Sequence, residues 1–369
     1  MIYNYWSFSG NDRLIDTIRM KKLSIKSQIG STGVEIPPII FGTSALGNLY
    51  KALPDDQKLS IISNWFKYIE SPIVIDSAGK YGAGLALEVI GDGLRKLDVD
   101  PKEIIISNKL GWLRTDLKTP EPTFEPGVWA DLKYDACQNI SYDGIIECYH
   151  QGIELLGGGY KTDIVSVHDP DEYLSAATDE VDRSRRMDDI LAAYSALEHL
   201  KYKGKASAIG IGSKDWKIIK LIADEVSLDW VMLATEYTIM DHHPDLIAFV
   251  SKLDSRNISV INSAVFHGGF LTGGEFYNYR KVNRENQDDR NLFEWRDKFY
   301  MHCRNYNILP SDACMMFGIS HPGIRSVALN TSWPEVIEHN VNLIQRKIDP
   351  DFWRDLKNDG LIEISYNYV

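Results

Sequence analysis

Short apolar segments alternate along the chain with longer segments in which apolar residues return every three or four positions. Segments of the first kind are typical of strands buried on both faces, and those of the second kind of helices with one buried stripe. The strands that we predict span residues 38–41, 73–75, 104–106, 163–167, 206–211, 230–233, 259–261 and 325–329. The predicted helices span residues 55–70, 84–97, 142–156, 187–203, 215–226, 244–254 and 292–306. In the fourth helix the buried stripe consists of Ile190, Leu191, Tyr194, Leu197 and Leu200.

Eight strand–helix units without a break in composition favour one α/β domain, a (β/α)8 TIM barrel, over two domains. We expect residues 1–369 to form a single domain, with an N-terminal extension (1–21), a barrel (22–345) and a C-terminal tail (346–369). Residues 22–35 alternate apolar and polar side chains around a Gly-Ser-Thr-Gly turn, which predicts a β-hairpin across the bottom of the barrel. An open doubly wound sheet is the alternative, but residues 42–47 give only a G-x-x-x-x-G spacing.

Three connections are longer than average, at residues 110–141, 169–187 and 266–290, and each follows a predicted strand. In a barrel such loops stand on the C-terminal face, where active sites are built. The first loop carries four aromatic residues, Trp112, Phe124, Trp129 and Tyr134. These aromatic side chains are suited to a pocket wall or lid, and equally to a loop held in place by its own side chains.

Composition narrows the classes of partner. Hydrophobic residues make up 44% of the 369 residues, enough for a large core, while 40 Lys and Arg against 52 Asp and Glu give a net charge of -12. This charge disfavours nucleic acid and anionic lipid as partners. No segment approaches the ~20 apolar residues of a membrane helix, and the N-terminus lacks the pattern of a secretory signal. We therefore expect a cytoplasmic protein, monomeric or a small homo-oligomer, with four reduced cysteines, Cys137, Cys148, Cys303 and Cys314.

Two clusters of polar residues are better explained without a ligand. His242 and His243 are adjacent, so their rings cannot share one helix face, and no C-x-x-C or H-E-x-x-H spacing accompanies them. We therefore predict no metal site. The basic residues at 183–186 follow three acidic residues and are more typical of a solvated, self-paired loop than of a phosphate site.

Ionisable residues stand where three neighbouring strands end. Asp76 ends the second strand and Tyr81 follows it, Lys109 ends the third, and His168 ends the fourth. Each has a structural explanation when taken singly, such as a turn cap for Asp76 or a solvated loop lysine for Lys109. At successive strand ends of one barrel, however, the four side chains would converge on one mouth, which favours a shared site.

The residues around these positions resemble those of the aldo-keto reductases, and most closely the aldose 1-dehydrogenase branch that includes D-threo-aldose, L-fucose and L-galactose dehydrogenases. The resemblance extends over about residues 22–345. The matching stretches are residues 37–50, 76–82, 107–111, 167–171, 197–216 and 266–274.

The resemblance implies a catalytic tetrad of Asp76, Tyr81, Lys109 and His168. In that family a hydride passes between a nicotinamide and a carbonyl or carbinol carbon, while the protein handles the proton. Tyr81 would exchange this proton, with Lys109 favouring its phenolate and Asp76 orienting the lysine. His168 would donate to the substrate oxygen.

The resemblance also implies a nicotinamide cofactor at the mouth of the barrel. Where NADPH-dependent members carry a lysine and an arginine for the 2′-phosphate, this chain has Asn330 and Val336. We therefore expect NAD, with NADP possible if Arg325 or a lysine from another loop substitutes. Other departures are Gly212, Ser213 and Lys214 in place of a Ser-Asn pair, Ala234 for a glutamine and Ser263 for a stacking tyrosine. The implied cofactor contacts are Gly42, Thr43, Ser44, Ser213, Phe266, Asn330, Thr331 and Asn340.

Substrate contacts are expected at Tyr50, Trp112 and Trp129. The leading interpretation is an NAD(P)-dependent enzyme that oxidises the anomeric carbon of a free aldose to give a lactone. A broad NADPH-dependent aldehyde or carbonyl reductase is the alternative, for which an apolar pocket lined by the two tryptophans would be suitable. A third interpretation is a barrel that binds nicotinamide cofactors without catalysis, because a fold does not imply an activity.

Overall fold

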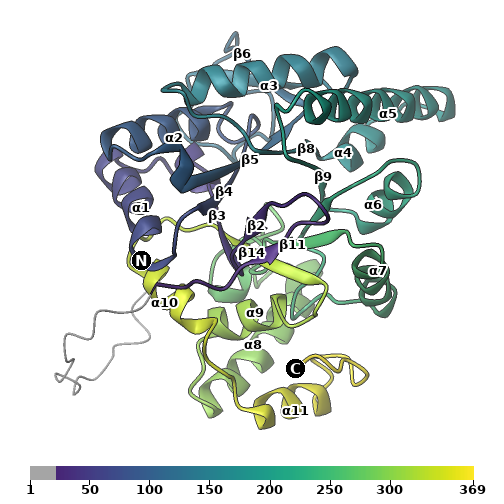
Figure 1. Cartoon of the computed structure of the whole chain (residues 1–369). Coiled ribbons are helices and arrows are strands. Elements are labelled where there is room, and N and C mark those ends of the chain that lie inside the picture. Colours follow the sequence, from purple (N-terminus) through teal and green to yellow (C-terminus); the bar gives the residue numbers. More distant parts are fainter. Residues whose placement is uncertain (1–21) are drawn as a thin grey trace.

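The computed structural model describes residues 22–369, and its centre is a closed barrel of eight parallel strands (Figure 1). The strands follow one another around the barrel in chain order, and the last pairs with the first. This arrangement confirms the predicted fold class and all eight predicted strands. They are β3 (Ile39–Gly42), β4 (Ile73–Ala78), β5 (Ile104–Leu110), β8 (Ile164–His168), β9 (Ala208–Ser213), β10 (Trp230–Ala234), β11 (Ser259–Ser263) and β14 (Ile324–Leu329).

Helices surround the barrel, and each of the seven predicted ones is present (Figure 1). These are α1 (Asp55–Tyr68), α2 (Leu85–Lys96), α3 (Tyr142–Leu156), α5 (Glu180–Tyr202), α6 (Trp216–Ala223), α7 (Pro244–Ser255) and α8 (Arg290–Asn305). The pattern missed four further helices, α4 (Pro170–Ser175), α9 (Pro310–Gly318), α10 (Val336–Leu343) and α11 (Pro350–Asn358). Short 3₁₀ segments occur at η1 (Ser44–Gly47), η2 (Pro101–Glu103), η3 (Phe270–Thr272) and η4 (Gln287–Asp289).

The prediction of a long loop at residues 169–187 is wrong. Helix α4 and the first turns of α5 occupy most of this segment. Asp179 caps α5 by accepting a hydrogen bond from the backbone N–H of Asp182, and Arg185 pairs with Asp182 and Asp189 at 2.6 Å each. The basic segment is therefore self-paired, as expected, but within a helix. Its stabilisation comes from a cap and from ion pairs three and four residues apart, which hydrophobic spacing does not register.

The N-terminal hairpin closes the lower end of the barrel, as predicted. Strands β1 (Ser27–Gln28) and β2 (Glu35–Ile36) pair antiparallel, so the regular part of the hairpin is short. Ile29 and Ile36 are fully buried against inward-facing barrel residues, among them Trp230. The interior of the barrel is thus packed with side chains at this end.

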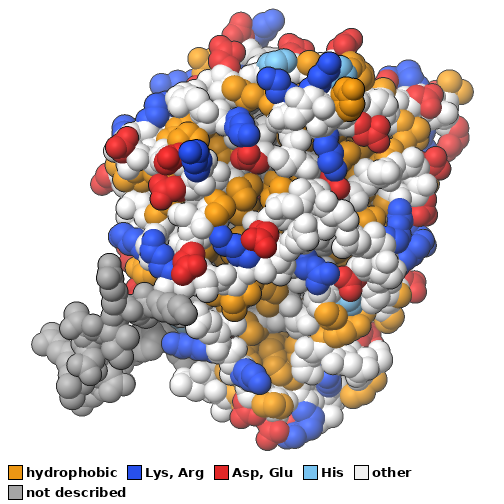
Figure 2. All heavy atoms as spheres, in the orientation of Figure 1, with side chains coloured by type: hydrophobic (Ala, Val, Ile, Leu, Met, Phe, Trp, Pro, Cys, Tyr) orange, Lys and Arg blue, Asp and Glu red, His pale blue; other side chains and the backbone are white. Residues whose placement is uncertain are grey.

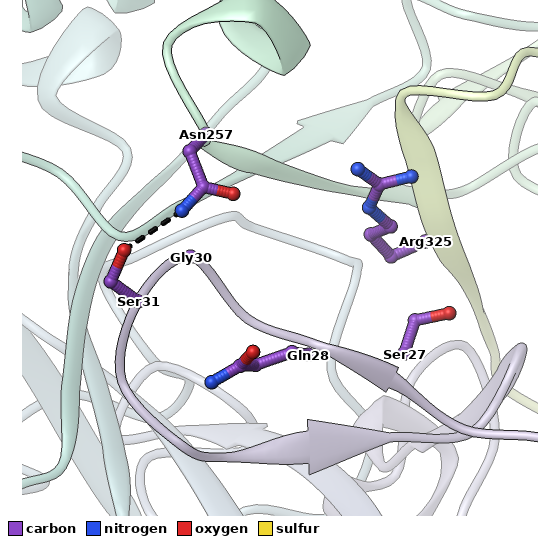
Figure 3. Close-up of a pocket in the computed structure, with 6 residues that line it drawn as sticks. All are labelled: Ser27, Gln28, Gly30, Ser31, Asn257 and Arg325. Carbon is purple, nitrogen blue, oxygen red and sulfur yellow. Dashed lines mark hydrogen bonds between the residues drawn. The ribbon is translucent and has the colours of Figure 1, made fainter.

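A polar cavity of about 500 Å³ lies between this hairpin and the starts of the barrel strands (Figure 3). Arg325, at the start of β14, lines it, but its guanidinium already donates to Asp254 and to the carbonyl of Pro322 at 2.6 Å each. The cavity is at the opposite end of the barrel from the predicted tetrad. It is lined by Ser27, Gln28, Gly30, Ser31, Asn257 and Arg325.

The predicted C-terminal tail packs closely on the barrel. Helix α11 buries Phe352 and Trp353, and the hydroxyl of Tyr366 bonds to that of Tyr237 at 2.6 Å and to Ser320 at 2.5 Å. Residues 346–369 thereby contribute to the main core. The division into a single domain over 1–369 stays a prediction, because residues 1–21 lie outside the described residues.

The other two long loops each fold into a small antiparallel hairpin. Strands β6 (Trp112–Asp116) and β7 (Tyr134–Gln138) pair within the first, and β12 (Phe276–Tyr277) and β13 (Arg280–Lys281) within the last. Both follow strand ends, β5 and β11 respectively, and so stand at the mouth of the barrel.

Acidic and basic side chains are interspersed over the face of the molecule seen in Figure 2, so the net charge of -12 is not gathered into one patch there. Between residues 22 and 369, none of the helices has the length and apolar character needed to cross a membrane.

The packing of α2 against α3 gives a test of the fold. A Cβ atom on Gly91 would lie 1.8 Å from the backbone oxygen of Leu156, whereas one on Gly93 would meet only the end of the Ile62 side chain, at 2.3 Å. Both changes to alanine gain helix propensity, roughly 1 kcal/mol. We expect Gly91→Ala to lower the free energy of unfolding by about 1–3 kcal/mol, because backbone cannot yield as a side chain does. Gly93→Ala is the matched control, and equal urea denaturation midpoints for the two variants would contradict the packing described.

Candidate active site

Four ionisable side chains converge at the mouth of the barrel. Asp76, Lys109 and His168 occupy the last residues of β4, β5 and β8, and Tyr81 follows β4 in the next turn. The ammonium of Lys109 is buried against the carboxylate of Asp76 and lies 4.7 Å from the centre of the Tyr81 ring. The rings of Tyr81 and His168 meet edge to face at 5.7 Å. The structure therefore brings together all four residues predicted from the strand ends.

Glycine holds the Tyr81 turn in place. Gly82 has a φ of 60°, in the left-handed region, and a Cβ atom there would lie 2.3 Å from the carbonyl oxygen of Gly47. Only glycine lets the two loops cross this closely. The turn that carries Tyr81 is thus pressed against the loop after β3, which fixes the distance of the phenol from the strand ends.

Burial favours the neutral form of both Tyr81 and His168. Burial raises the pKa of Tyr81 well above its usual value, and the carboxylate of Asp76 adds to the effect. Burial likewise lowers the pKa of His168 well below its usual value. Burial and the Asp76 carboxylate, which lies directly against the Lys109 ammonium, outweigh the lowering of the Tyr81 pKa that we expected from Lys109.

Aromatic residues of the long loop after β5 form a wall beside Tyr81. Trp112, Phe124 and Trp129 pack together, and the Trp129 ring lies 5.9 Å from that of Tyr81. Tyr50 is stacked on Phe276 at 4.2 Å. The three predicted substrate contacts therefore lie at the mouth, and the loop aromatics pack both on one another and on Tyr81.

Two buried polar atoms on aromatic side chains at the mouth have no hydrogen-bond partner among residues 22–369. They are the hydroxyl of Tyr50 and the indole nitrogen of Trp112. By contrast, the indole nitrogen of Trp129 donates to Glu125 at 2.7 Å. An unpartnered buried donor costs about 1–3 kcal/mol, so such groups point to a polar ligand.

The sequence did not reveal a second set of charges at the mouth, which we call the mouth ion cluster (Lys80, Lys214, Glu125, Asp169 and Glu172). Lys80 is only 2% exposed and lies 2.8 Å from a carboxylate oxygen of each of the three acids. Lys214 pairs with Glu172 and lies over the ring of Tyr279, at 4.8 Å. Lys80 precedes Tyr81 and Asp169 follows His168, but only the fold shows that these two neighbours pair.

A model of the Aldo/keto reductase family matches residues 38–358 of the chain. The chain belongs to this family. It is therefore an oxidoreductase of a group that uses nicotinamide cofactors and small carbonyl substrates.

Its relatives include the pyridoxal 4-dehydrogenase of Microbacterium luteolum, 26% identical over 92% of this chain and 99% of the relative. The D-threo-aldose 1-dehydrogenase of a Pseudomonas species is 25% identical, over 92% and 98% of the two chains. The L-galactose dehydrogenase of Arabidopsis thaliana is 21% identical, over 87% and 88%.

Solved aldo/keto reductase structures share the fold. An aldo-keto reductase from Bacillus halodurans in its holo form aligns with a TM-score of 0.66 at 17% identity, over 93% of this chain and 97% of that one. A glycerol dehydrogenase from Gluconobacter oxydans aligns with a TM-score of 0.65 at 14% identity, over 93% and 98%. At these identities the likeness shows the barrel alone.

Most predicted cofactor contacts of this aldo/keto reductase lie at strand ends or directly after them. Asn340 is the exception, since it lies within helix α10. Two of the contacts also tie loops together: Thr43 donates to the carbonyl of Asp76 at 2.9 Å, and Asn330 accepts from the backbone of Ala45 at 2.9 Å. Of the remaining contacts, Gly42 and Ser213 are the last residues of β3 and β9, and the others lie in the loops that follow β3, β11 and β14: Ser44, Phe266 and Thr331.

The residues present fit a nicotinamide. One carboxylate oxygen of Asp171 is buried without a hydrogen-bond partner in the described part of the chain, and the Asp171 side chain interacts with Ser213. Burial, and then the nearby Asp169, raise the pKa of Asp171 to about 6. A carboxamide supplies the N–H donor that such an acceptor lacks.

No group of three or more His, Cys, Asp or Glu side chains within residues 22–369 is arranged to hold a metal ion. His242 instead has structural partners: its Nδ1 faces the carbonyl of Thr238 at 3.1 Å, and its Nε2 accepts from the backbone of Glu363 at 3.0 Å.

The charge state of His168 can be measured directly. Because burial lowers its pKa, the ring should stay neutral through the pH range in which an ordinary histidine takes up a proton. His339 provides an internal contrast, because its hydrogen bond to Asp312 raises its pKa. We expect NMR of ¹⁵N-histidine-labelled protein to show His339 titrating above about pH 6.5 and His168 unprotonated at about pH 6. Protonation of His168 near pH 6.5 would contradict the buried environment described.

Proposed function

We propose that this aldo/keto reductase oxidises the anomeric carbon of a free aldose with NAD, giving a lactone. The observation that carries the proposal is the pair of unpartnered buried donors at the mouth, on Tyr50 and on Trp112, of which Trp112 belongs to the aromatic cluster that packs against Tyr81. Two buried donors require acceptors, and sugar hydroxyls supply them while an aromatic wall covers the apolar face of the ring. The named activities of two relatives, on D-threo-aldoses and on L-galactose, support the same substrate class.

The tetrad assigns each proton movement to a side chain. When bound, the oxidised nicotinamide accepts the hydride from C1 of the sugar and adds a positive charge to the site. Tyr81 first loses its own proton to solvent, a loss that the positive charge of the bound cofactor would favour. Its phenolate then takes the proton of the anomeric hydroxyl, so that the C1–O bond becomes a carbonyl as the C1–H bond breaks. Lys109 and Asp76 hold the phenol and its charge in place, and His168 donates to the same substrate oxygen.

NAD is the proposed cofactor because the segment in which a 2′-phosphate would find its lysine and arginine carries neither. Residues 330–340 contain neither lysine nor arginine, and His339 is engaged by Asp312 at 2.7 Å. The position of Arg325 argues against its contacting a 2′-phosphate. It lies at the start of β14, beside the cavity at the other end of the barrel (Figure 3).

The apolar wall itself favours a second candidate, a reductase of aromatic aldehydes. Trp112, Phe124 and Trp129 are each less than a tenth exposed and would bury an aromatic ring well. Such a ligand, however, leaves the donors of Tyr50 and Trp112 unpartnered. A spectrophotometric panel separates the two: free sugars with NAD and NADP in one arm, aromatic aldehydes with NADH and NADPH in the other. Turnover confined to the aldehyde arm would overturn the sugar assignment.

Removing one hydroxyl tests the role of Tyr81. In Tyr81→Phe the ring contacts with His168 and Trp129 remain, but the proton-exchanging group is lost. We expect kcat with the best substrate to fall by about 10²-fold to 10⁴-fold, with the Kd of NADH unchanged within about twofold. Tyr50→Phe is the matched control, because it removes a hydroxyl from the same mouth and should raise KM more than it lowers kcat. Full turnover in Tyr81→Phe would sink the tetrad assignment.

Cofactor choice is tested at Val336. Introducing arginine there adds the charge that a 2′-phosphate needs, while Val336→Gln adds length without charge. One charge-assisted contact of about 1.5–3 kcal/mol should raise kcat/KM for NADP relative to NAD by roughly 10-fold to 100-fold. We expect the wild-type protein and Val336→Gln to prefer NAD. A wild-type preference for NADP would show that another residue supplies the missing charge.

A further inference from the structure

Asp169 combines an unusual backbone with an unusual use of its carboxylate. Its φ is 51°, in the left-handed region, and its N–H donates to the carbonyl of Gly212 on β9 at 2.9 Å. It stands at the N-cap position of α4, where an aspartate ordinarily accepts a helix N–H, yet its side chain makes no such bond. The carboxylate is turned toward the active site instead.

One oxygen of that carboxylate faces three groups at once. Oδ2 of Asp169 lies 2.8 Å from Nζ of Lys80, 3.8 Å from Nζ of Lys214 and 3.6 Å from Nε2 of His168. All but Lys214 are nearly fully buried. The distance to His168 is too long for a hydrogen bond, but two buried groups this close interact strongly through their charges and dipoles.

The other nitrogen of His168 does not set the orientation of the ring. Nδ1 is buried and has no hydrogen-bond partner among the described residues. In most catalytic histidines a bond at one nitrogen decides which nitrogen carries the proton. In this protein the group that decides which nitrogen is protonated must therefore lie on the Nε2 side, where Asp169 is the neighbouring acceptor.

We propose that Asp169, clamped by Lys80, is a positioning residue that keeps the proton of neutral His168 on Nε2 and aims that N–H toward the reacting oxygen. The proposal rests on the proposed function only for the identity of that oxygen. An anion beside Nε2 favours the tautomer that carries its proton on Nε2, because the positive end of the N–H dipole then faces the anion. Lys80 keeps the carboxylate ionised and holds it at a distance from which it does not capture the N–H.

The charged groups around His168 predict the direction in which each substitution should shift its pKa. Asp169 faces it from its own segment, Lys109 from β5, Lys80 and Tyr81 from the turn after β4, and Lys214 from the loop after β9. After burial, Asp169 raises the pKa of His168 and the three lysines lower it. Removing Asp169 and removing Lys80 should therefore shift the titration of His168 in opposite directions, which a simple loss of packing would not do.

The test is the ring ¹⁵N spectrum of His168 in histidine-labelled protein, assigned by its loss in His168→Asn, together with kcat against pH. In the wild type we expect the Nε2–H form. In Asp169→Asn we expect Nδ1–H to become populated and kcat to fall on the order of tenfold to a hundredfold, with the KM for cofactor little changed. In Lys80→Met we expect Nε2–H to persist while His168 takes up a proton at higher pH, moving the acidic limb of kcat upward.

Glu172→Gln is the matched control. Glu172 contacts both Lys80 and Lys214 but not His168, so its loss weakens the mouth ion cluster without changing the Nε2 side. A wild-type tautomer and unchanged kcat in Asp169→Asn would overturn the proposal, as would an equal fall in Glu172→Gln. If Lys80→Met does not fold, the other two variants still decide. The spectrum needs no substrate, so a failure of the sugar assignment would leave this result intact and show itself in the substrate panel alone.

Discussion

The ion pair between Lys109 and Asp76 is the contact on which the rest of the mouth depends. It joins β4 to β5 inside the barrel. Burying two charges away from water is costly unless each has a partner of opposite charge and further hydrogen bonds. The neighbouring Ser107 hydroxyl donates to Asp76 at 3.0 Å, and Lys109 also reaches the carbonyl of Ser77 at 3.3 Å. With its donors and acceptors occupied, the pair fixes the point above which Tyr81 has to lie.

Around this pair the mouth carries further opposed charges beside its aromatic wall. With the mouth ion cluster added, three ammonium groups face four carboxylates, so one carboxylate is in excess. A slight excess of negative charge in a poorly solvated site stabilises a cationic ring more than a neutral one. The electrostatics of the mouth would thus favour an oxidised nicotinamide over a reduced one.

Hydrophobic periodicity was sufficient for the barrel because each of its strands is buried on both faces and reads as a short apolar segment. The convergence of Asp76, Lys109 and His168 could also be predicted, since residues at the ends of parallel strands meet at one edge whatever the loops do; their catalytic role stays a prediction. Periodicity failed where polar interactions stabilise a helix. We predicted a loop for α4 and the start of α5 because this segment lacks a regular apolar stripe, and a cap and ion pairs stabilise the start of α5 instead. Periodicity also could not place Lys80 beside Asp169, which are 89 residues apart, nor exclude Arg325 from the cofactor site.

The hairpin below the barrel has a consequence for how this enzyme can change over evolutionary time. Because Ile29 and Ile36 fill the lower opening, substitutions there alter the free energy of unfolding but reach no reacting atom. Among the residues that the structure describes, the loops at the other end of the barrel, where a substrate would bind, do not contact this plug. Substitutions in the mouth loops can therefore change which substrate is preferred while leaving the packing of the plug intact.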